Sequence, residues 1–182
     1  MEKLNYKELY SETCIRNRIK ELAAEISKNY TDDKPVVCVC VLRGAVMFYT
    51  DLMKELRNDN LVYDFVTLSS YEHALVSGGM TTSGRVRLIQ DLRENVEGKH
   101  VLVVEDIVDS GYTIEYLRTY FASKNPIDVK IACLLDKPMT RKVDAHADYI
   151  AFTLERPAFI IGYGLDSNQR YRNLPGIYEV VD

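Results

Sequence analysis

The stretch Val101-Leu-Val-Val-Glu-Asp-Ile-Val-Asp-Ser-Gly-Tyr-Thr113 decides the expected fold of this chain. It begins as an apolar run typical of a buried strand, carries two adjacent carboxylates at the expected strand end, and continues into a small polar turn. A helical pattern follows from Ile114 to about Ala122. A strand that ends in carboxylates and leads through hydroxyl groups into a helix N-terminus predicts a site for a phosphate and a hydroxylated sugar.

Strands and helices alternate on both sides of this stretch. Helical spacing predicts one helix from about Tyr6 to Asn29 and another from Ala45 to Arg57. Apolar runs predict strands at 36–42, 61–68, 86–89 and 127–135, and shorter ones at 149–154, 159–163 and 177–181. The predicted fold class is α/β, with a mainly parallel twisted sheet flanked by helices. We expect one domain, 1–182, with a small C-terminal strand-and-loop hood at about 136–182.

Composition narrows the class of protein. The 182 residues are 47% hydrophobic and 27% charged, which is typical of a globular domain. A net charge of −4 argues against a broad nucleic-acid surface, and no apolar run is long enough for a membrane span. The four cysteines lack a second Cys or His pair for zinc and predict reduced thiols, mostly buried. Together with an N-terminus unlike a secretory signal, this predicts a soluble cytoplasmic protein.

Three polar segments follow predicted strand ends, where ligands bind in open parallel sheets. They are Leu42–Gly44, Ser69–Tyr71 and Glu105–Thr113. Hydroxyl and backbone N–H groups of the last segment suit a phosphate, and its carboxylates suit sugar hydroxyls or a hydrated metal. Helix capping by Asp109 or Ser110 is the competing explanation, but it leaves the acidic pair at 105–106 unexplained. The polar segment 71–85 is long for a connection and predicts a lid.

The segment Glu105-Asp-Ile-Val-Asp-Ser-Gly-Tyr-Thr113 resembles the phosphoribosyl-pyrophosphate signature of the type I phosphoribosyltransferases. Further segments resemble the hypoxanthine (hypoxanthine-guanine) phosphoribosyltransferase branch of that family and occur in the expected order. They are Leu42–Gly44, Ser70–Tyr71, Leu135–Pro138, Phe159–Asp166 and Tyr171–Leu174. The resemblance therefore extends from residue 42 to residue 174.

This resemblance implies a magnesium-dependent purine-salvage enzyme. It would transfer the 5-phosphoribosyl group of phosphoribosyl pyrophosphate to hypoxanthine, with guanine as an expected second base, giving IMP or GMP and pyrophosphate. Its partners would be these two substrates and further copies of itself, as a dimer or tetramer, with no nucleic acid and no membrane. A xanthine-preferring enzyme and a nucleic-acid-binding regulator of the same fold remain alternatives, although the retained motif residues favour catalysis.

The resemblance also implies residue roles. The phosphoribosyl pyrophosphate would contact Leu42, Arg43, Gly44, Glu105, Asp106, Asp109, Ser110, Gly111, Tyr112, Thr113 and Arg172, with a non-proline cis peptide often found at the first of these segments. The purine would contact Lys137, Phe159, Ile160 and Asp166. Magnesium would bind near Glu105, Asp106 and Asp166. Catalysis would rest on Asp109, as general base at the purine N7, and on Ser70 and Tyr71 at the start of the lid.

Overall fold

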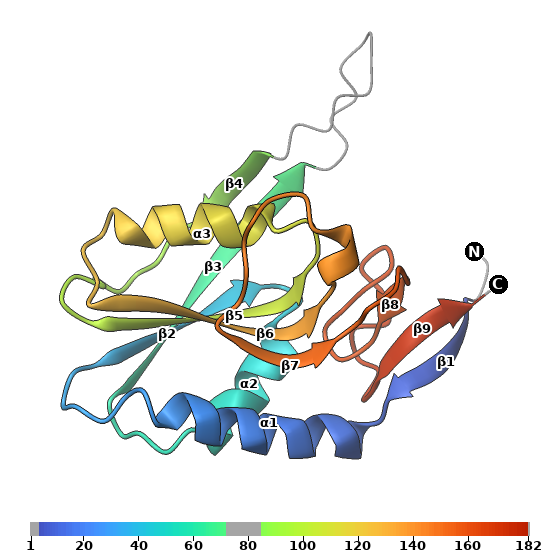
Figure 1. Ribbon diagram of the computed structural model, residues 1–182, viewed down its shortest axis with the longest axis horizontal. Coiled ribbons are helices and arrows are strands. Elements are labelled where there is room, and N and C mark those ends of the chain that lie inside the picture. Colours follow the sequence, from blue (N-terminus) through green and yellow to red (C-terminus); the bar gives the residue numbers. More distant parts are fainter. Residues whose placement is uncertain (1–3, 72–84, 182) are drawn as a thin grey trace, which may run out of the picture.

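The computed structural model describes residues 4–71 and 85–181 and contains a large and a small sheet (Figure 1). The strands of the large sheet lie in the order β4-β3-β2-β5-β6-β7, and all neighbours are parallel except the antiparallel pair β3–β4. Their bounds are β2 Val36–Leu42, β3 Leu61–Tyr71, β4 Arg85–Gln90, β5 His100–Val108, β6 Asp128–Asp136 and β7 Tyr149–Thr153. The predicted α/β class with a mainly parallel sheet is confirmed.

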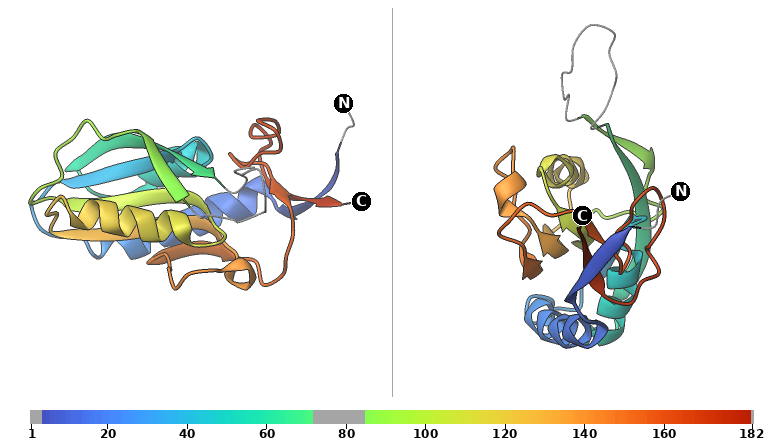
Figure 2. Two further views of the ribbon diagram at one scale, coloured as in Figure 1. Left: turned by 90° about the horizontal axis from the view of Figure 1, so that it is seen from above. Right: turned by 90° about the vertical axis from the view of Figure 1, so that its right-hand side faces the viewer.

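Helices cover both faces of the large sheet. On one face lie α1 (Glu12–Ser27) and α2 (Val46–Glu55), and on the other lies α3 (Tyr112–Ala122), as the right-hand view of Figure 2 shows. Because successive strand residues point to opposite faces, the central strands supply two hydrophobic cores. Leu102 and Val104 pack under α1 and α2, whereas Val101 and Val103 pack under α3.

The small antiparallel sheet has the order β1-β9-β8 and consists of β1 (Asn5–Tyr10), β9 (Ile177–Val181) and β8 (Ile160–Ile161). The prediction of a helix from Tyr6 was wrong at its start, because 5–10 pair with β9. Helix α1 begins after Ser11, whose hydroxyl accepts a hydrogen bond from the N–H of Cys14 at 3.3 Å. Within the predicted hood segment, β7 belongs to the large sheet.

Strand register brings the predicted polar segments to one edge of the large sheet. Leu42 is level with Thr67 of β3, and Val108 of β5 is level with Asp136 of β6. A short 3₁₀ helix, η1 (Pro138–Thr140), follows β6 at the same edge. None of the helices in the described ranges has the length and apolar character that crossing a membrane requires.

Candidate active site

A cavity of about 170 Å³ lies beyond the carboxyl end of β2. Strand β2 ends at Leu42, whereas β5 continues to Val108, so the last residues of β5 form a wall that β2 does not cover. Ligands of open parallel sheets bind at this position. The cavity is lined by Val41, Leu42, Arg43, Gly44, Leu68, Glu105, Asp106, Thr113, Asp166 and Arg172. Most of these residues were predicted, but Val41 and Leu68 were not.

The sequence had suggested that Glu105 and Asp106 stand at the end of their strand. In the structure they lie within β5, which continues to Val108. Burial raises the pKa of Glu105 well above its ordinary value, and the charge of Asp106 raises it further. Burial also raises the pKa of Asp106 to about 6, although the N–H of Ile107 and the charge of Arg172 oppose this. Oε2 of Glu105 is buried and has no hydrogen-bond partner among the described residues. A buried carboxylate oxygen in this state is suited to a substrate hydroxyl or a cation.

Gly44 packs directly on Asp106. A Cβ at Gly44 would lie 1.4 Å from Oδ2 of Asp106, so only glycine fits here. On its other side lies Gly164, where a Cβ would be 2.0 Å from the carbonyl oxygen of Gly44 and where φ is +100°. The preceding Leu42–Arg43 peptide is cis. The loop at 42–44 is thus held between the acidic strand and the hood.

Arg172 joins the hood to the cavity. Its guanidinium lies 2.7 Å from Oδ1 of Asp166 and donates to the carbonyl of Gly164 at 2.6 Å. The side-chain oxygen of Gln169 accepts from Arg172 at 3.1 Å and from Arg43 at 3.2 Å. Two cations therefore converge on one amide at the cavity. Sequence patterns gave no signal for Gln169, because its role depends on a fold that brings it beside the distant Arg43 as well as the nearby Arg172.

The turn 109–111 leads into α3 with no side-chain cap. The N-cap residue is Gly111, at φ +92°, and no side chain bonds the first turn. The capping explanation for Asp109 and Ser110 is therefore wrong. The uncapped N–H groups that begin at Tyr112 form the positive end of the helix, where an anion binds favourably. Thr113, in the first turn of α3, also lines the cavity.

Asp109 is paired with a lysine from the next strand. Nζ of Lys137 lies 3.1 Å from Oδ2 of Asp109, and the Lys137 side chain is largely buried after the end of β6. The guanidinium of Arg141 donates to the backbone carbonyl of Asp109 at 2.9 Å and also pairs with the carboxylate of Asp136. Arg141 was not among the predicted residues. It ties the turn at 109 to the segment that carries Lys137.

The remaining predicted residues lie outside the cavity or have side chains outside the described residues. Phe159 is 55% exposed, so part of its ring is open to contact, and it precedes the buried Ile160 of β8. Ser70 and Tyr71 end β3, but their side chains and the expected lid after them lie outside the described residues. Asp109, Lys137, Phe159 and Ile160 do not line the cavity above, so the expected purine contacts lie beside it and not within it.

The cavity fits a magnesium ion only with help from a substrate. In the described ranges, no three His, Cys, Asp or Glu side chains gather as a metal-binding group. Mg²⁺, however, commonly binds one or two carboxylates and completes its shell with phosphate oxygens and water. Glu105, with its unpartnered Oε2, and Asp106 offer such a pair, whereas Asp166 is already paired with Arg172.

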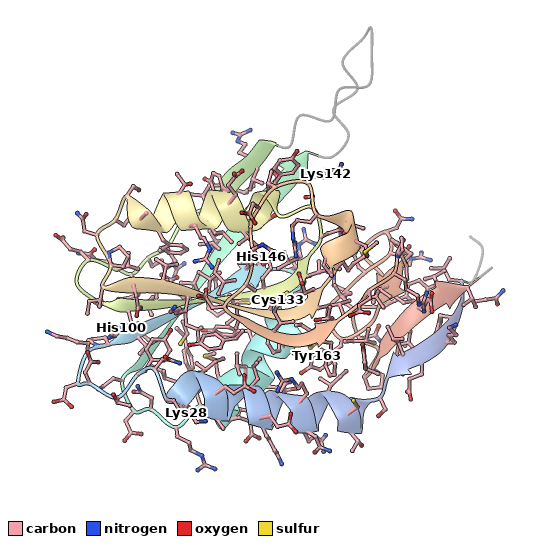
Figure 3. The ribbon with its side chains drawn as sticks, viewed as in Figure 1. Lys28, His100, Cys133, Lys142, His146 and Tyr163 are labelled. Atoms are coloured by element: carbon pink, nitrogen blue, oxygen red, sulfur yellow. The ribbon has the colours of Figure 1, made fainter. Side chains whose placement is uncertain are left out.

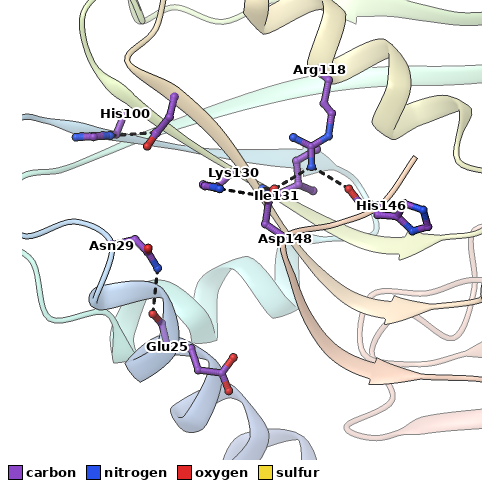
Figure 4. Close-up of polar contacts among 9 residues, drawn as sticks. Glu25, Asn29, His100, Arg118, Lys130, Ile131, His146 and Asp148 are labelled. Atoms are coloured by element: carbon purple, nitrogen blue, oxygen red, sulfur yellow. Dashed lines mark hydrogen bonds and ion pairs between the residues drawn. The ribbon is translucent and has the colours of Figure 1, made fainter. Parts of the chain in front are cut away.

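The described histidines lie apart from this site. His100, at the start of β5, contacts Asp128 and Asp32, and His146 contributes its backbone carbonyl to Arg118 (Figure 4). Asp148 organises the same region by accepting from Arg118, Lys130 and the N–H of Ile131. This cluster joins α3, β6 and the start of β7 and explains these polar residues structurally.

The fold and the acidic cavity at the strand ends indicate a phosphoribosyltransferase, and comparison with known proteins confirms this class. Residues 5–168 match the phosphoribosyl transferase domain, so the chain belongs to the phosphoribosyltransferase family. Its relatives narrow the group. It is 44% identical to the hypoxanthine-guanine phosphoribosyltransferase of Bacillus subtilis (strain 168) over 171 residues, which cover 94% of this chain and 91% of the relative.

Two further proteins are similar to this chain over nearly its whole length. The hypoxanthine-guanine-xanthine phosphoribosyltransferase of Tritrichomonas foetus is 44% identical over 170 residues, 93% of this chain and 88% of that protein. A crystal structure of a hypoxanthine-guanine phosphoribosyltransferase from Bacillus anthracis matches with a TM-score of 0.87 at 39% identity, covering 99% of both chains. The fold expected from the resemblance is therefore confirmed.

Proposed function

We propose that this protein transfers the 5-phosphoribosyl group of phosphoribosyl pyrophosphate to hypoxanthine and guanine, in purine salvage. In this reaction the purine N9 bonds to C1′, the bond from C1′ to pyrophosphate breaks, and the purine loses a proton. The observation that carries the proposal is the pairing of Asp109 with Lys137 beside the acidic cavity at 105–106. The relatives named above support the same activity.

The purine side of the reaction requires a proton acceptor and a donor. Asp109 would hold the proton of N7 while N9 attacks, because a carboxylate within reach of that proton acts as a general base. Lys137 would donate to the O6 atom of the base, which requires its ammonium to leave Asp109 or to bridge both groups. Phe159 would stack on the ring through its exposed face. Ile160 would contact the edge of the base through backbone groups.

The phosphoribosyl side uses the cavity and the helix N-terminus. The turn from Ser110 to Thr113 would bind the 5′-phosphate through uncapped N–H groups and hydroxyls. Glu105 and Asp106 would accept hydrogen bonds from the ribose hydroxyls. Negative charge grows on the departing pyrophosphate, and Arg172, together with the loop 42–44, would stabilise it.

We propose Mg²⁺ as the cofactor, bound near Glu105 and Asp106 and, on the pyrophosphate side, Asp166. When bound, it would neutralise phosphate charge and so favour departure of pyrophosphate. The unpartnered Oε2 of Glu105 supports this assignment. The protein residues alone orient the ribose and hold the loop 42–44 in place.

Xanthine is the second candidate base. The Tritrichomonas foetus relative, whose name includes xanthine, is as similar to this chain as the Bacillus subtilis protein whose name omits it. Hypoxanthine, guanine and xanthine all carry O6, so the expected contact with Lys137 does not separate them. Discrimination would depend on backbone groups near Asp166 that meet the C2 substituent.

We further propose that the protein is a cytoplasmic homo-oligomer. The described cysteines are free, and Cys38, Cys40 and Cys133 are buried, which suits a reducing compartment. Tyr63 and Phe65 of β3 are exposed on the face that bears α2, and such apolar exposure favours a protein contact. Sedimentation at several protein concentrations tests the oligomeric state, and a monomer at all of them would contradict the proposed homo-oligomer.

A steady-state assay of hypoxanthine, guanine and xanthine, each with phosphoribosyl pyrophosphate and Mg²⁺, tests the proposed function. We expect IMP and GMP, identified by chromatography, together with pyrophosphate, and we expect both to disappear when a chelator removes the metal. Xanthine turnover at least equal to that of hypoxanthine would select the second candidate. If no base gave a nucleotide, the enzymatic proposal would be wrong.

A further inference from the structure

A tyrosine in the hood has an unusual backbone conformation. Gly162, Tyr163 and Gly164 all have positive φ, at 95°, 48° and 100°. Glycine adopts such values easily, but a bulky residue rarely does. Tyr163 is nevertheless held there by its own N–H, which donates to the carbonyl of Leu174 at 2.9 Å. The Tyr163 side chain, labelled in Figure 3, reaches α2 through its hydroxyl group.

The hydroxyl of Tyr163 makes a specific contact with α2. It donates to Oδ2 of Asp51 at 2.7 Å, and the Tyr163 side chain is almost wholly buried. Oδ1 of Asp51 binds Lys54 at 3.1 Å, and the Asp51 side chain is 46% exposed. Water would therefore solvate Asp51 if the phenol were removed. Because solvation would replace most of what this bond contributes to folding, its position suggests another role.

The contact lies next to the parts of the site that would bind pyrophosphate. Residue 164, adjacent to Tyr163, packs on the carbonyl of Gly44 with no room for a side chain, and its own carbonyl anchors Arg172 at 2.6 Å. Arg172 lines the acidic cavity and also a second cavity of about 160 Å³, which Asp51 and Tyr163 line. The hydrogen bond thus lies on the far side of Arg172 from the acidic strand.

We propose that Tyr163 and Asp51 form a positioning pair that sets the distance between α2 and the hood. The inference rests on the function proposed above. Through residues 163 and 164, the pair would hold Arg172 and the loop 42–44 at the spacing that the departing pyrophosphate requires. Tyr163 does not line the acidic cavity, so it acts through these neighbours and not on the substrate. A hydrogen bond to a carboxylate is strong enough for this task, and small displacements of aligned groups slow a reaction severely.

The test removes only the hydroxyl. In Tyr163→Phe the ring remains, and we expect kcat/KM for phosphoribosyl pyrophosphate to fall about tenfold, with KM for hypoxanthine at saturating co-substrate unchanged within about twofold. Inhibition by added pyrophosphate should weaken in parallel. Asp51→Ala should reproduce the effect, whereas Asp51→Asn, which keeps an oxygen acceptor, should restore most of the activity. The double variant Tyr163→Phe/Asp51→Ala should be no worse than either single change.

Two controls separate positioning from general stability. Tyr49→Phe removes a buried hydroxyl from the same helix, one that donates to the carbonyl of Cys38 at 2.9 Å away from the hood, and should lower the Tm without changing kcat/KM. Lys54→Met removes the other partner of Asp51 and should change neither.

The outcomes distinguish this inference from the proposed function. Wild-type turnover together with unchanged kcat/KM in Tyr163→Phe and Asp51→Ala would overturn the positioning pair and leave the function intact. A KM for hypoxanthine that changes by more than about twofold in the single variants, or additive losses in the double variant, would also overturn it. If the wild-type protein formed no nucleotide at all, both proposals would fall together.

Discussion

Lys137 and Asp109 come from different strand ends and meet at 3.1 Å between Nζ and Oδ2. The pairing places a cation beside the carboxylate that we propose as the general base. The two opposite charges also compensate each other in a partly buried place. A base that offers O6 to the lysine and the N7 proton to the carboxylate would substitute for this contact.

Asp109→Asn is expected to lower kcat by about 10²–10⁴-fold, because an amide cannot take up the N7 proton. Binding of phosphoribosyl pyrophosphate, measured by calorimetry with Mg²⁺, should change little, since the turn still begins α3. Asp144→Asn, on an exposed loop, provides the matched control. Near-normal turnover in the Asp109 variant would place the proton transfer elsewhere.

Gly44→Ala is expected to reduce kcat/KM for phosphoribosyl pyrophosphate by about 10²-fold or more. The new methyl group would overlap the Asp106 carboxylate, so either this carboxylate or the loop must move. Gly98→Ala is the control: its φ of +66° makes alanine strained, but nothing lies within 4 Å of the added Cβ. The control should lose stability and keep its activity. Similar kinetics for the two variants would contradict the close packing.

The raised pKa of Asp106 predicts a pH effect on activity. Since this pKa is about 6 in the folded protein, Asp106 gains its proton as pH falls through 6 and can no longer serve as an anionic ligand. We expect kcat/KM for phosphoribosyl pyrophosphate to fall below about pH 6, as a pH profile would show. The profile of Asp106→Asn should be lower throughout and lack this step. A wild-type profile that stays flat down to pH 5 would contradict the assignment.

The same shift has an opposite consequence for stability. A carboxyl whose pKa rises on folding binds its proton more tightly when folded, so its ionised form destabilises the fold above pH 6. This destabilisation is relieved as pH falls from about 6 towards the unfolded value of 3.8. Asp106→Asn should therefore raise the Tm more at pH 8 than at pH 5. Calorimetric scans at the two pH values measure the difference.

His100 predicts a pH effect of the other sign. Burial disfavours its charged form, but hydrogen bonds with Asp128 and Asp32 outweigh burial and raise its pKa above 6.5. The stability it contributes is fully present below about pH 6.5 and is lost as pH rises through the raised pKa. Urea unfolding of wild type and His100→Asn should therefore differ most at pH 6 and least at pH 9. His146→Asn, on an exposed loop, should follow the wild type at both.

Local patterns predicted the large sheet well but missed β1. The central strands are buried on both faces, so their continuous apolar runs indicate strands without further information. Residues 5–10 form a partly exposed strand whose partner, β9, lies at the other end of the sequence, and the helix pattern of α1 was extended over them. Ser11 was a usable signal, because serine commonly marks a helix start.

The site was predictable where motifs are contiguous and unpredictable where it depends on contacts between segments. The acidic pair and the turn at 109–113 could be read directly from one stretch. The packing of Gly164 on Gly44, the bridge through Gln169 and the support from Arg141 join residues far apart in the sequence. None of these has a periodicity or a motif, so only the folded chain reveals them.

The pairing of β1 with β9 also determines the order in which the protein can be completed during synthesis. The first strand emerges from the ribosome early, but its partner emerges only after the large sheet has been translated. Until then residues 5–10 have no partner strand of their own chain. The hood, and with it the seat of Arg172, would therefore be assembled last, so a nascent chain could hold a nearly finished sheet before it could bind both substrates.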